Sequence, residues 1–276
     1  MEKSVKESVV ESYGRLAESA KNKITSKLFS CCAPADRTHT VGKSIGYSEE
    51  VLNSVPQNSN LGVGCGNPSA FAGIQKGETV IDLGSGAGFD AFVVSPLVGE
   101  NGTVIGVDLS EKMLDLAKEN ASKHNYSNVN FVKGDIEQLP LDDNIAEHVI
   151  SNCVINLSQN KGDVFKEAHR VLKNGGSLSI SDIVLTKELP GFIQESMAAH
   201  IACISGAEKV ADYLEYIREA GFRDIKIESK SAFPLELMLG DPQVMKVAKE
   251  LNFTPDSKEV NDIVSRVVSI SLSAKK

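Results

Sequence analysis

The sequence lacks the features that mark three broad classes of protein. It has no basic surplus, because 29 Lys and Arg stand against 37 Asp and Glu in 276 residues, a formal net charge of −8, whereas binding of polyanions needs a basic face. No apolar run approaches the roughly 20 residues of a membrane span. The charged N-terminal residues lack the apolar segment of a signal peptide. We therefore expect a cytoplasmic protein that binds neither nucleic acid nor membrane.

Cysteine is scarce, and its pattern excludes further classes. The absence of any CxxC pair removes support for a zinc ribbon or a thioredoxin-like site. An odd number of cysteines without an export signal argues against a disulfide framework and for reduced thiols. Each cysteine taken alone is compatible with a small buried hydrophobe. The five are Cys31, Cys32, Cys65, Cys153 and Cys203.

Hydrophobic periodicity divides the chain into three parts. Residues 2–29 carry apolar side chains at near-helical spacing and predict an amphipathic helix. Residues 31–68 are rich in Gly, Pro, Ser and Asn and predict a long loop region, which in a compact chain is more often functional than not. From residue 79 apolar strands alternate with helices, which predicts a parallel sheet covered on both faces. The first five predicted strands are TVIDL, TVIGVD, NVNFVKGD, AEHVISN and SLSISDIVL.

Beyond Leu185 the alternation changes. We predict helices over 190–204 and 206–220, a sixth strand at FRDIKIES, helical segments at PLELMLGDPQVMKVAKELN and SKEVNDIV, and a seventh strand in VSRVVSISLS. The predicted fold class is therefore α/β, with a doubly wound, seven-stranded, mostly parallel sheet and helical insertions before the sixth and seventh strands.

A glycine-rich turn follows the first predicted strand. In VIDLGSGAGFD, Gly84, Gly86 and Gly88 come between a strand and a helix, where glycine permits tight turning and close approach of the backbone to a ligand. The spacing matches the dinucleotide fingerprint GxGxxG imperfectly. The motif alone leaves a nicotinamide dinucleotide open.

Acidic residues lie at the ends of three successive strands. Asp82, at the end of the first strand, would repel a pyrophosphate but suits a cationic amino-acid group. Asp108 closes the second strand and can accept hydrogen bonds from both ribose hydroxyls, and Asp135 follows the third, where it can accept from an adenine amino group. Each alone could be a turn or cap residue. Together they indicate a neutral-to-cationic nucleoside rather than a diphosphate.

These residues resemble the class I S-adenosylmethionine-dependent methyltransferases over about residues 70–190. The resemblance implies a Rossmann-like core, with S-adenosylmethionine bound above the strand ends. Asn152 could orient the acceptor or the cofactor, or cap the turn after the fourth strand. The positions expected to bind the cofactor are Asp82, Gly84, Ser85, Gly86, Gly88, Asp108, Leu109, Met113, Gly134, Asp135, Ile136 and Asn152.

Three of the cysteines fall on segments that such a fold presents above the strand ends. Cys65 lies in NLGVGCGNP, Cys153 follows the fourth strand in SNCVINL, and Cys203 joins the two inserted helices. Three soft thiolates that converge suit a soft, three-coordinate centre with a lone pair, and trivalent arsenic is such a centre. Its lone pair can attack a sulfonium methyl group, so the reaction needs orientation more than a general base.

The flanking segments resemble the arsenite methyltransferases from about residue 30 to residue 230. The matching stretches include CCAPADRTHTVGKSIGYSEE, NLGVGCGNP, SNCVINLS and EAHRVLKNGG. The resemblance implies that Cys65, Cys153 and Cys203 carry arsenic through successive methylations. It also implies that Cys31 or Cys32 relays the substrate or forms the disulfide that reduces a pentavalent intermediate. Which of the two adjacent thiols does so stays open.

The same resemblance implies partners and a division of the chain. Arsenite and methylarsenicals are the expected substrates of a monomeric enzyme, and a thiol such as glutathione or thioredoxin is the expected reductant. Many bacterial and algal relatives have vicinal cysteines near the C-terminus, but no thiol follows Cys203 here. The expected parts are an N-terminal helix and cysteine-bearing loop (1–68), the cofactor-binding core (69–186), an arsenic-binding helical insertion (187–222) and a segment completing the sheet (223–276).

Two other functions remain open at this point. A C- or O-methyltransferase acting on a quinone-like ring would use the same fold, and it predicts a long apolar cavity under the inserted helices. A non-catalytic metalloid-binding protein would keep the thiols and lack turnover.

Overall fold

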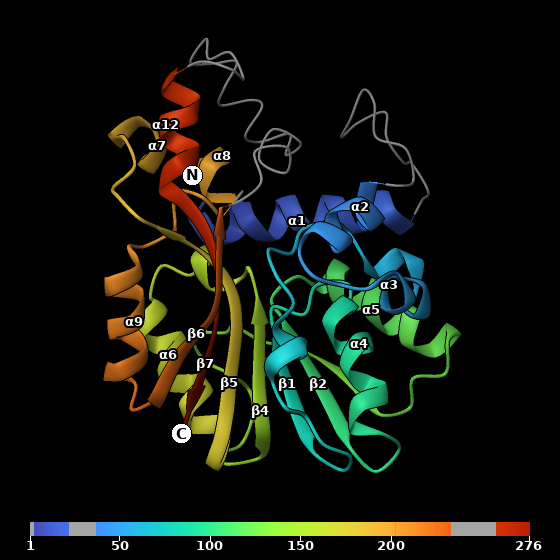
Figure 1. Cartoon of the computed structure of the whole chain (residues 1–276). Helices are drawn as coiled ribbons and strands as arrows, with labels where there is room; N and C mark the ends of the chain where they lie inside the picture. The colour runs from blue at the N-terminus through green and yellow to red at the C-terminus, as the bar shows by residue number, and fades with distance from the viewer. Residues whose placement is uncertain (1–2, 22–36, 202, 233–257) are drawn as a thin grey trace.

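A computed structural model describes residues 3–21, 37–201, 203–232 and 258–276 (Figure 1). Its α-helices are α1 (Val5–Lys21), α2 (Arg37–Ser44), α3 (Glu49–Ser54), α4 (Phe89–Val98), α5 (Glu111–Lys123), α6 (Lys161–Val171), α7 (Gly191–Gln194), α8 (Met197–Ile201), α9 (Val210–Glu219) and α12 (Lys258–Arg266). Its 3-10 helices are η1 (Gln57–Ser59), η2 (Pro68–Phe71) and η3 (Ile155–Leu157). Its strands are β1 (Thr79–Leu83), β2 (Thr103–Asp108), β3 (Val129–Lys133), β4 (Ala146–Asn152), β5 (Leu172–Leu185), β6 (Arg223–Ala232) and β7 (Val267–Lys275).

The seven strands form one sheet in the order β3-β2-β1-β4-β5-β7-β6. Strands β1 to β5 run parallel, and β7 lies antiparallel between β5 and β6. The prediction of a doubly wound, mostly parallel, seven-stranded sheet is confirmed. Successive strands are added on one side of β1 up to β3 and on its other side from β4 onward, so the strand order reverses between β1 and β4. Ligands of such folds bind in the crevice at that point.

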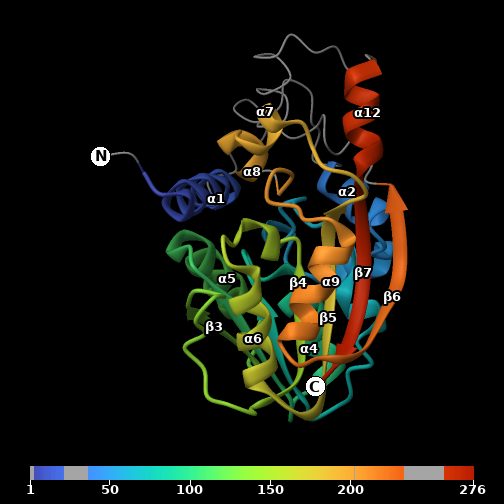
Figure 2. The same ribbon diagram turned by 90° about the vertical axis from the view of Figure 1, so that its left-hand side faces the viewer.

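Helices cover both faces of the sheet (Figure 2). Val80, Ile81 and Leu83 of β1 are fully buried, as expected for a parallel strand with helices on both sides. On one face α4 and α5 pack against the sheet around Phe92. On the other face α6 and α9 pack around Phe165. Each such side chain contributes about 1.5–3 kcal/mol by burial.

The structure corrects several predicted element bounds. The predicted loop 31–68 is wrong for its described part, which contains α2, α3, η1 and η2. The predicted helix 190–204 is two short helices, because the Ser196 hydroxyl accepts a hydrogen bond from the backbone N–H of Ala199 at 3.3 Å and starts α8. The predicted helix over residues 2–29 is described only as α1, and the segment at 235–251 lies outside the described residues.

Helix α1 crosses above the carboxyl ends of the strands (Figures 1 and 2). Its buried residue Ala17 packs in one apolar cluster with Met113 and Leu116 of α5. The ion pair between Lys112 of α5 and Glu18 of α1, at 2.8 Å, adds a second tie. In the described part of the chain, no helix has the length and apolarity needed to cross a membrane.

Candidate active site

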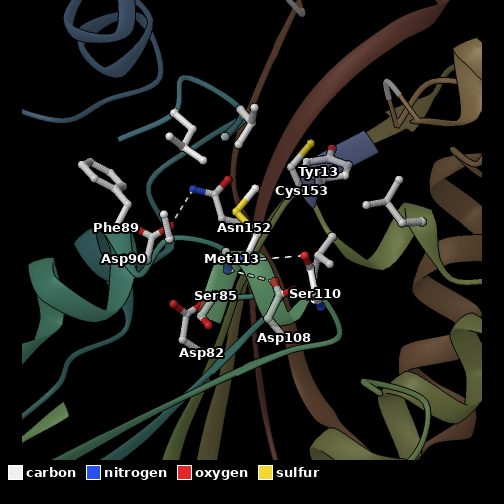
Figure 3. Close-up of a pocket in the computed structure, with 18 of the residues that line it drawn as sticks. Tyr13, Asp82, Ser85, Phe89, Asp90, Asp108, Ser110, Met113, Asn152 and Cys153 are labelled. Atoms are coloured by element: carbon white, nitrogen blue, oxygen red, sulfur yellow. Dashed lines mark hydrogen bonds between the residues drawn. The ribbon is translucent and has the colours of Figure 1, made fainter. Parts of the chain in front are cut away.

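A cavity lies at the carboxyl ends of β1, β2, β3 and β4, beneath α1. Eleven of the twelve positions predicted to bind a cofactor line it, and Tyr13 of α1 and Cys153 share the same wall (Figure 3). The eleven are Asp82, Gly84, Ser85, Gly86, Asp108, Leu109, Met113, Gly134, Asp135, Ile136 and Asn152. The twelfth, Gly88, is not among the lining residues.

The glycine-rich turn shows why two of its glycines are required. Gly84 has φ +65°, and a Cβ there would lie 2.3 Å from the Cγ2 of Val154. Gly88, at φ +89°, begins α4, and its Cβ would lie 2.7 Å from the ring of Phe131. Only glycine combines this backbone conformation with these close approaches. Gly84 therefore shapes the cavity wall, whereas Gly88 serves packing of α4 on the sheet.

The floor of the cavity is acidic. Asp82 is 2% exposed, and its Oδ2 has no hydrogen-bond partner. Burial, together with the charges of Asp90 and Asp108, raises the pKa of Asp82 well above its usual value. An unpartnered buried carboxylate oxygen is costly unless a donor satisfies it. A ligand ammonium group would do so, whereas a diphosphate offers no donor and would add to the acidic charge, so the floor favours a cationic group over a dinucleotide.

Asp108 is held in place by the glycine turn. Its Oδ2 accepts a hydrogen bond from the N–H of Gly86 at 2.9 Å, and its Oδ1 accepts from the N–H of Ser110 at 2.8 Å (Figure 3). A carboxylate has about four acceptor positions. The remaining positions suit the two vicinal hydroxyls of a ribose.

At the far end of the cavity, Asp135 is engaged by a residue that the sequence pattern did not reveal. Lys6 of α1 donates to Asp135 Oδ2 at 2.6 Å and to Glu137 Oε2 at 2.8 Å. Burial lowers the pKa of Lys6, but the two carboxylates outweigh it and raise the pKa above its usual value. Lys6 of α1 thus covers the end of the cavity at which the adenine of the cofactor is expected to bind. Lys6 and Asp135 are 129 residues apart, and no local motif signals such a pair.

Two further lining residues were missed by the sequence analysis. Tyr47 is buried in the segment expected to be a loop, and its hydroxyl donates to Asp90 Oδ1. Asp90 is the last residue of VIDLGSGAGFD, and the glycine spacing of that motif does not mark it as a lining residue. Burial is the main reason that the pKa values of both groups are raised.

The three separated cysteines come together beside this cavity. Cys65, Cys153 and Cys203 are 4%, 8% and 3% exposed, are free thiols and share one apolar cluster. The Cys203 thiol donates to the carbonyl of Cys153 at 3.1 Å, and the Cys65 thiol donates to the carbonyl of Ser181 at 3.3 Å. Cys31 and Cys32 lie outside the described residues.

The backbone aims two of these thiols through a conformation that non-glycine residues seldom adopt. Cys153 and Cys203 both have φ +61°, which costs about 1–2 kcal/mol for an L-residue with a Cβ. Cys153 follows β4 directly, and its N–H donates to the carbonyl of Ser181 on β5 at 2.9 Å. The sheet therefore fixes Cys153 where it lines the cavity, while its carbonyl receives the Cys203 thiol.

All three thiols are neutral at neutral pH. Burial raises the pKa of Cys65 to about 11. A hydrogen bond with Cys203 lowers the pKa of Cys153, but a hydrogen bond with Cys65 and burial raise it well above its usual value. The hydrogen bond with Cys153, followed by burial, does the same for Cys203. A ligand that binds these sulfurs therefore has to displace their protons.

Asn152 links the cavity to the thiols. Its Nδ2 donates to Asp90 Oδ2 at 3.0 Å (Figure 3) and to the carbonyl of Gly66 at 2.9 Å. Its Oδ1 accepts from the N–H of Cys65 at 3.0 Å. Ser269 of β7 donates to the carbonyl of Cys65 at 2.7 Å, so the C-terminal strand also holds this loop.

A buried carboxylate lies beside the thiols. Asp182 of β5 is fully buried, and one of its oxygens lies with the sulfurs of Cys65 and Cys153 in a group whose atoms are all within 4.8 Å of one another. Its Oδ1 accepts from Asn156 Nδ2 at 2.9 Å, and its Oδ2 accepts from the hydroxyl of Tyr213 at 2.9 Å. Burial raises the pKa of Asp182 to about 7. The only sequence signal was an acid in the apolar strand SLSISDIVL.

Known proteins share this architecture. A family model described as "Methyltransferase domain" matches residues 74–221. The arsenite methyltransferase of Halobacterium salinarum is 44% identical over 201 residues, which cover 72% of this chain and 51% of that protein. The arsenite methyltransferase of Aquipseudomonas alcaligenes is 33% identical over 231 residues, covering 80% of this chain and 63% of that protein. The chain thus spans between half and two thirds of the length of these two relatives.

A solved structure extends the similarity to three dimensions. The arsenic(III) S-adenosylmethionine methyltransferase of Chlamydomonas reinhardtii superposes with a TM-score of 0.62 at 30% identity. The superposition covers 89% of this chain and 74% of that one. With the acid-floored cavity and its glycine turn, these matches show that the chain belongs to the methyltransferase-domain family and, within it, to the arsenite methyltransferases.

Proposed function

We propose that this protein transfers methyl groups from S-adenosylmethionine to trivalent arsenic held by Cys65, Cys153 and Cys203, and so detoxifies arsenite. The single observation that carries the proposal is the position of Cys153. It lines the cofactor cavity, its sulfur lies within 4.8 Å of that of Cys65, and its carbonyl accepts the Cys203 thiol at 3.1 Å. An acceptor atom bound to Cys153 is therefore held next to the methyl donor.

The cavity residues fit the donor by charge. The unpartnered Oδ2 of Asp82 would receive the ammonium group of the methionine part, and Asp108 would receive the ribose hydroxyls. Ile136 would cover the adenine, and Asp135 keeps acceptor capacity beside its bond to Lys6. When bound, S-adenosylmethionine supplies an electrophilic methyl group on a sulfonium centre. These residues hold and orient it.

The buried thiols bind arsenite without needing a base. Each sulfur–arsenic bond replaces an arsenic–hydroxyl bond, and the thiol proton leaves with the hydroxyl group as water. The neutral thiols are therefore suited to the task despite their raised pKa values. The resulting tris-thiolate is uncharged, matches the apolar surroundings and leaves the arsenic lone pair free to form the bond to carbon.

Methylation leaves arsenic pentavalent, because its lone pair has become the new bond. Two thiolates that leave as a disulfide return an electron pair to arsenic, and an external thiol then has to reduce that disulfide. Glutathione or thioredoxin is the external thiol that we propose for this reduction. Cys31 or Cys32 is the residue that we propose to relay the arsenic or to form the disulfide. We propose that the protein acts in the cytoplasm, where such thiols are kept reduced, and that it acts as a monomer. The helical segment 187–222 supplies Cys203, and residues 1–68 supply Cys65 and α1.

A quinone-like acceptor is the second candidate within the same fold. The demethylmenaquinone methyltransferase of Staphylococcus epidermidis is 31% identical over 144 residues, which cover 52% of this chain and 59% of that protein. That candidate needs a long apolar cavity under the helices of 187–222. Among the residues of 187–222 that the structure describes, none lines the cavity, and the floor of the cavity is acidic. Arsenic is therefore the favoured acceptor.

The proposal is tested by measuring S-adenosylhomocysteine formed in response to arsenite, together with arsenic speciation. We expect turnover in the wild type, and loss of the first methylation when Cys65, Cys153 or Cys203 is changed to Ser. Ala232→Ser on the exposed edge strand β6 is the matched control and should keep full activity. Turnover in all three cysteine variants would contradict the thiol site. Tight arsenite binding with no S-adenosylhomocysteine would identify a metalloid-binding protein instead.

A further inference from the structure

The thiol cluster contains one more donor than trivalent arsenic can use. Arsenic bound by three thiolates is pyramidal and keeps a lone pair, so it has no place for a carboxylate. The fully buried Asp182 nevertheless has an oxygen within 4.8 Å of the sulfurs of both Cys65 and Cys153. Methyl transfer as proposed above gives this carboxylate no role.

The spacing of these donors is close to what a tetrahedral metal ion requires. Zinc–sulfur bonds of about 2.3 Å and zinc–oxygen bonds of about 2.1 Å place neighbouring ligand atoms roughly 3.5–3.8 Å apart. The observed group fits within 4.8 Å, so the atoms need to close by about 1 Å. Cys203 adjoins this group, because its thiol donates to the carbonyl of Cys153 at 3.1 Å. Its sulfur is the nearest further soft donor, and it has to turn from that carbonyl toward the ion to complete the coordination.

Charge favours a dication once the thiols have given up their protons to bind a ligand. The negative charge of Asp182 acts unfavourably on ionised Cys65, Cys153 and Cys203 alike. A divalent cation placed between these groups converts those repulsions into attractions. A neutral arsenic adduct does not compensate the carboxylate.

We propose that Cys65, Cys153, Asp182 and Cys203 form a site for a four-coordinate d¹⁰ dication, Zn²⁺ or Cd²⁺. Occupation of this site consumes the arsenic-binding thiols, so the bound ion competes with arsenite. The carboxylate distinguishes the two occupants, because it ligates the dication and not the metalloid. The inference shares the thiols of the proposed function but does not depend on methyl transfer.

Asp182→Asn is the variant that separates the two. The asparagine Oδ1 can keep the bonds from Asn156 and from the N–H of Ile183, and its Nδ2 can donate to the oxygen of Tyr213 where the carboxylate now accepts. The shape of the pocket is thereby preserved while the anionic ligand is lost. Asp212→Asn, on an exposed acid of α9, is the matched control.

The first test is titration of the reduced full-length protein with cadmium chloride, followed by the sulfur-to-cadmium charge-transfer absorption. Zinc chloride is then used to displace cadmium. We expect one ion per chain in the wild type and in Asp212→Asn, and affinity at least about tenfold weaker in Asp182→Asn. Arsenite binding to Asp182→Asn should stay within about twofold of the wild type. Equal cadmium affinity in Asp182→Asn and wild type overturns the proposal, as does absence of the band.

Two further measurements keep the proposal falsifiable if Asp182→Asn does not fold. In wild-type crystals soaked in cadmium chloride, an anomalous peak should lie within bonding distance of both sulfurs and of an Asp182 oxygen. A peak on sulfurs alone overturns it. In solution, zinc should raise the arsenite concentration needed for metalloid binding, and a chelator should reverse that shift. If the wild type binds cadmium but never forms S-adenosylhomocysteine, the metal site stands and the proposed function fails.

Discussion

Replacing Asn152 by Ala should weaken the fold and the thiol site together. The amide makes three hydrogen bonds of 3.0 Å or shorter, with the N–H of Cys65, the carbonyl of Gly66 and the carboxylate of Asp90. Bonds between neutral groups contribute about 1 kcal/mol each, and a bond to a carboxylate contributes about 1.5–3 kcal/mol. The sum is about 3.5–5 kcal/mol. Because water in the adjacent cavity can replace part of it, we expect the free energy of unfolding to fall by about 3 kcal/mol.

Urea denaturation of the ligand-free protein measures this change, with Asn130→Ala on the exposed side of β3 as the matched control. Asn152→Asp gives an independent check, because it sets a second carboxylate against Asp90. Its loss of stability should be larger at pH 8 than at pH 5, because burial raises the pKa of Asp90 and a lower pH therefore relieves the repulsion between the two carboxylates. Arsenite affinity should also fall in Asn152→Ala, since the N–H of Cys65 loses its anchor. A loss of less than about 1 kcal/mol in Asn152→Ala would refute the reasoning.

Two other substitutions test the turn and the buried acid. Gly84→Ala should lower the melting temperature, because its Cβ would lie 2.3 Å from the Cγ2 and 2.6 Å from the Cβ of Val154 at φ +65°. Combining it with Val154→Gly, which removes both atoms, should narrow the gap to the Val154→Gly single variant; an unchanged gap would contradict the steric account. Asp182 loses its proton near pH 7 in the folded protein, against an ordinary pKa of 3.8. The folded state thus holds a proton that the unfolded chain releases, so stability falls as pH rises from about 4 to 7. Asp182→Asn should flatten that slope in urea unfolding at pH 4.5, 6 and 7.5; an unchanged slope would contradict the assignment.

The features around the cavity whose local structure the sequence predicts are those set by neighbouring residues. The glycine spacing after the first strand predicts the turn after β1, and the end of the second apolar strand predicts the position of Asp108. The cap of α5 is also local, since the Ser110 hydroxyl accepts from the N–H of Met113. Such features depend on backbone geometry over a few residues, and a pattern of residue types encodes them directly.

The remaining parts depend on pairs that only the folded chain creates. Tyr47 meets Asp90 across 43 residues, and Asp182 meets Tyr213 across 31. No periodicity marks such polar partners, because each is decided by which elements the sheet order brings together. Family resemblance points to the three cysteines, but it gives no account of the carboxylate beside them.

Helix α1 illustrates how a remote element can tie two sites together. Lys6 and Tyr13 are seven residues apart, which is two turns on one face and about 10.5 Å along the axis. Lys6 bonds to Asp135 at the adenine end of the cavity, and the hydroxyl of Tyr13 lies 4.0 Å from the sulfur of Cys203. The length of α1 between these residues therefore spans the distance from the expected adenine end to the third thiol. Because a helix is stiff over two turns, we expect any shift of α1 that separates Lys6 from Asp135 also to change the distance between Tyr13 and Cys203. Lys6→Ala should therefore alter arsenite affinity as well as cofactor affinity, and an unchanged arsenite affinity would contradict this link.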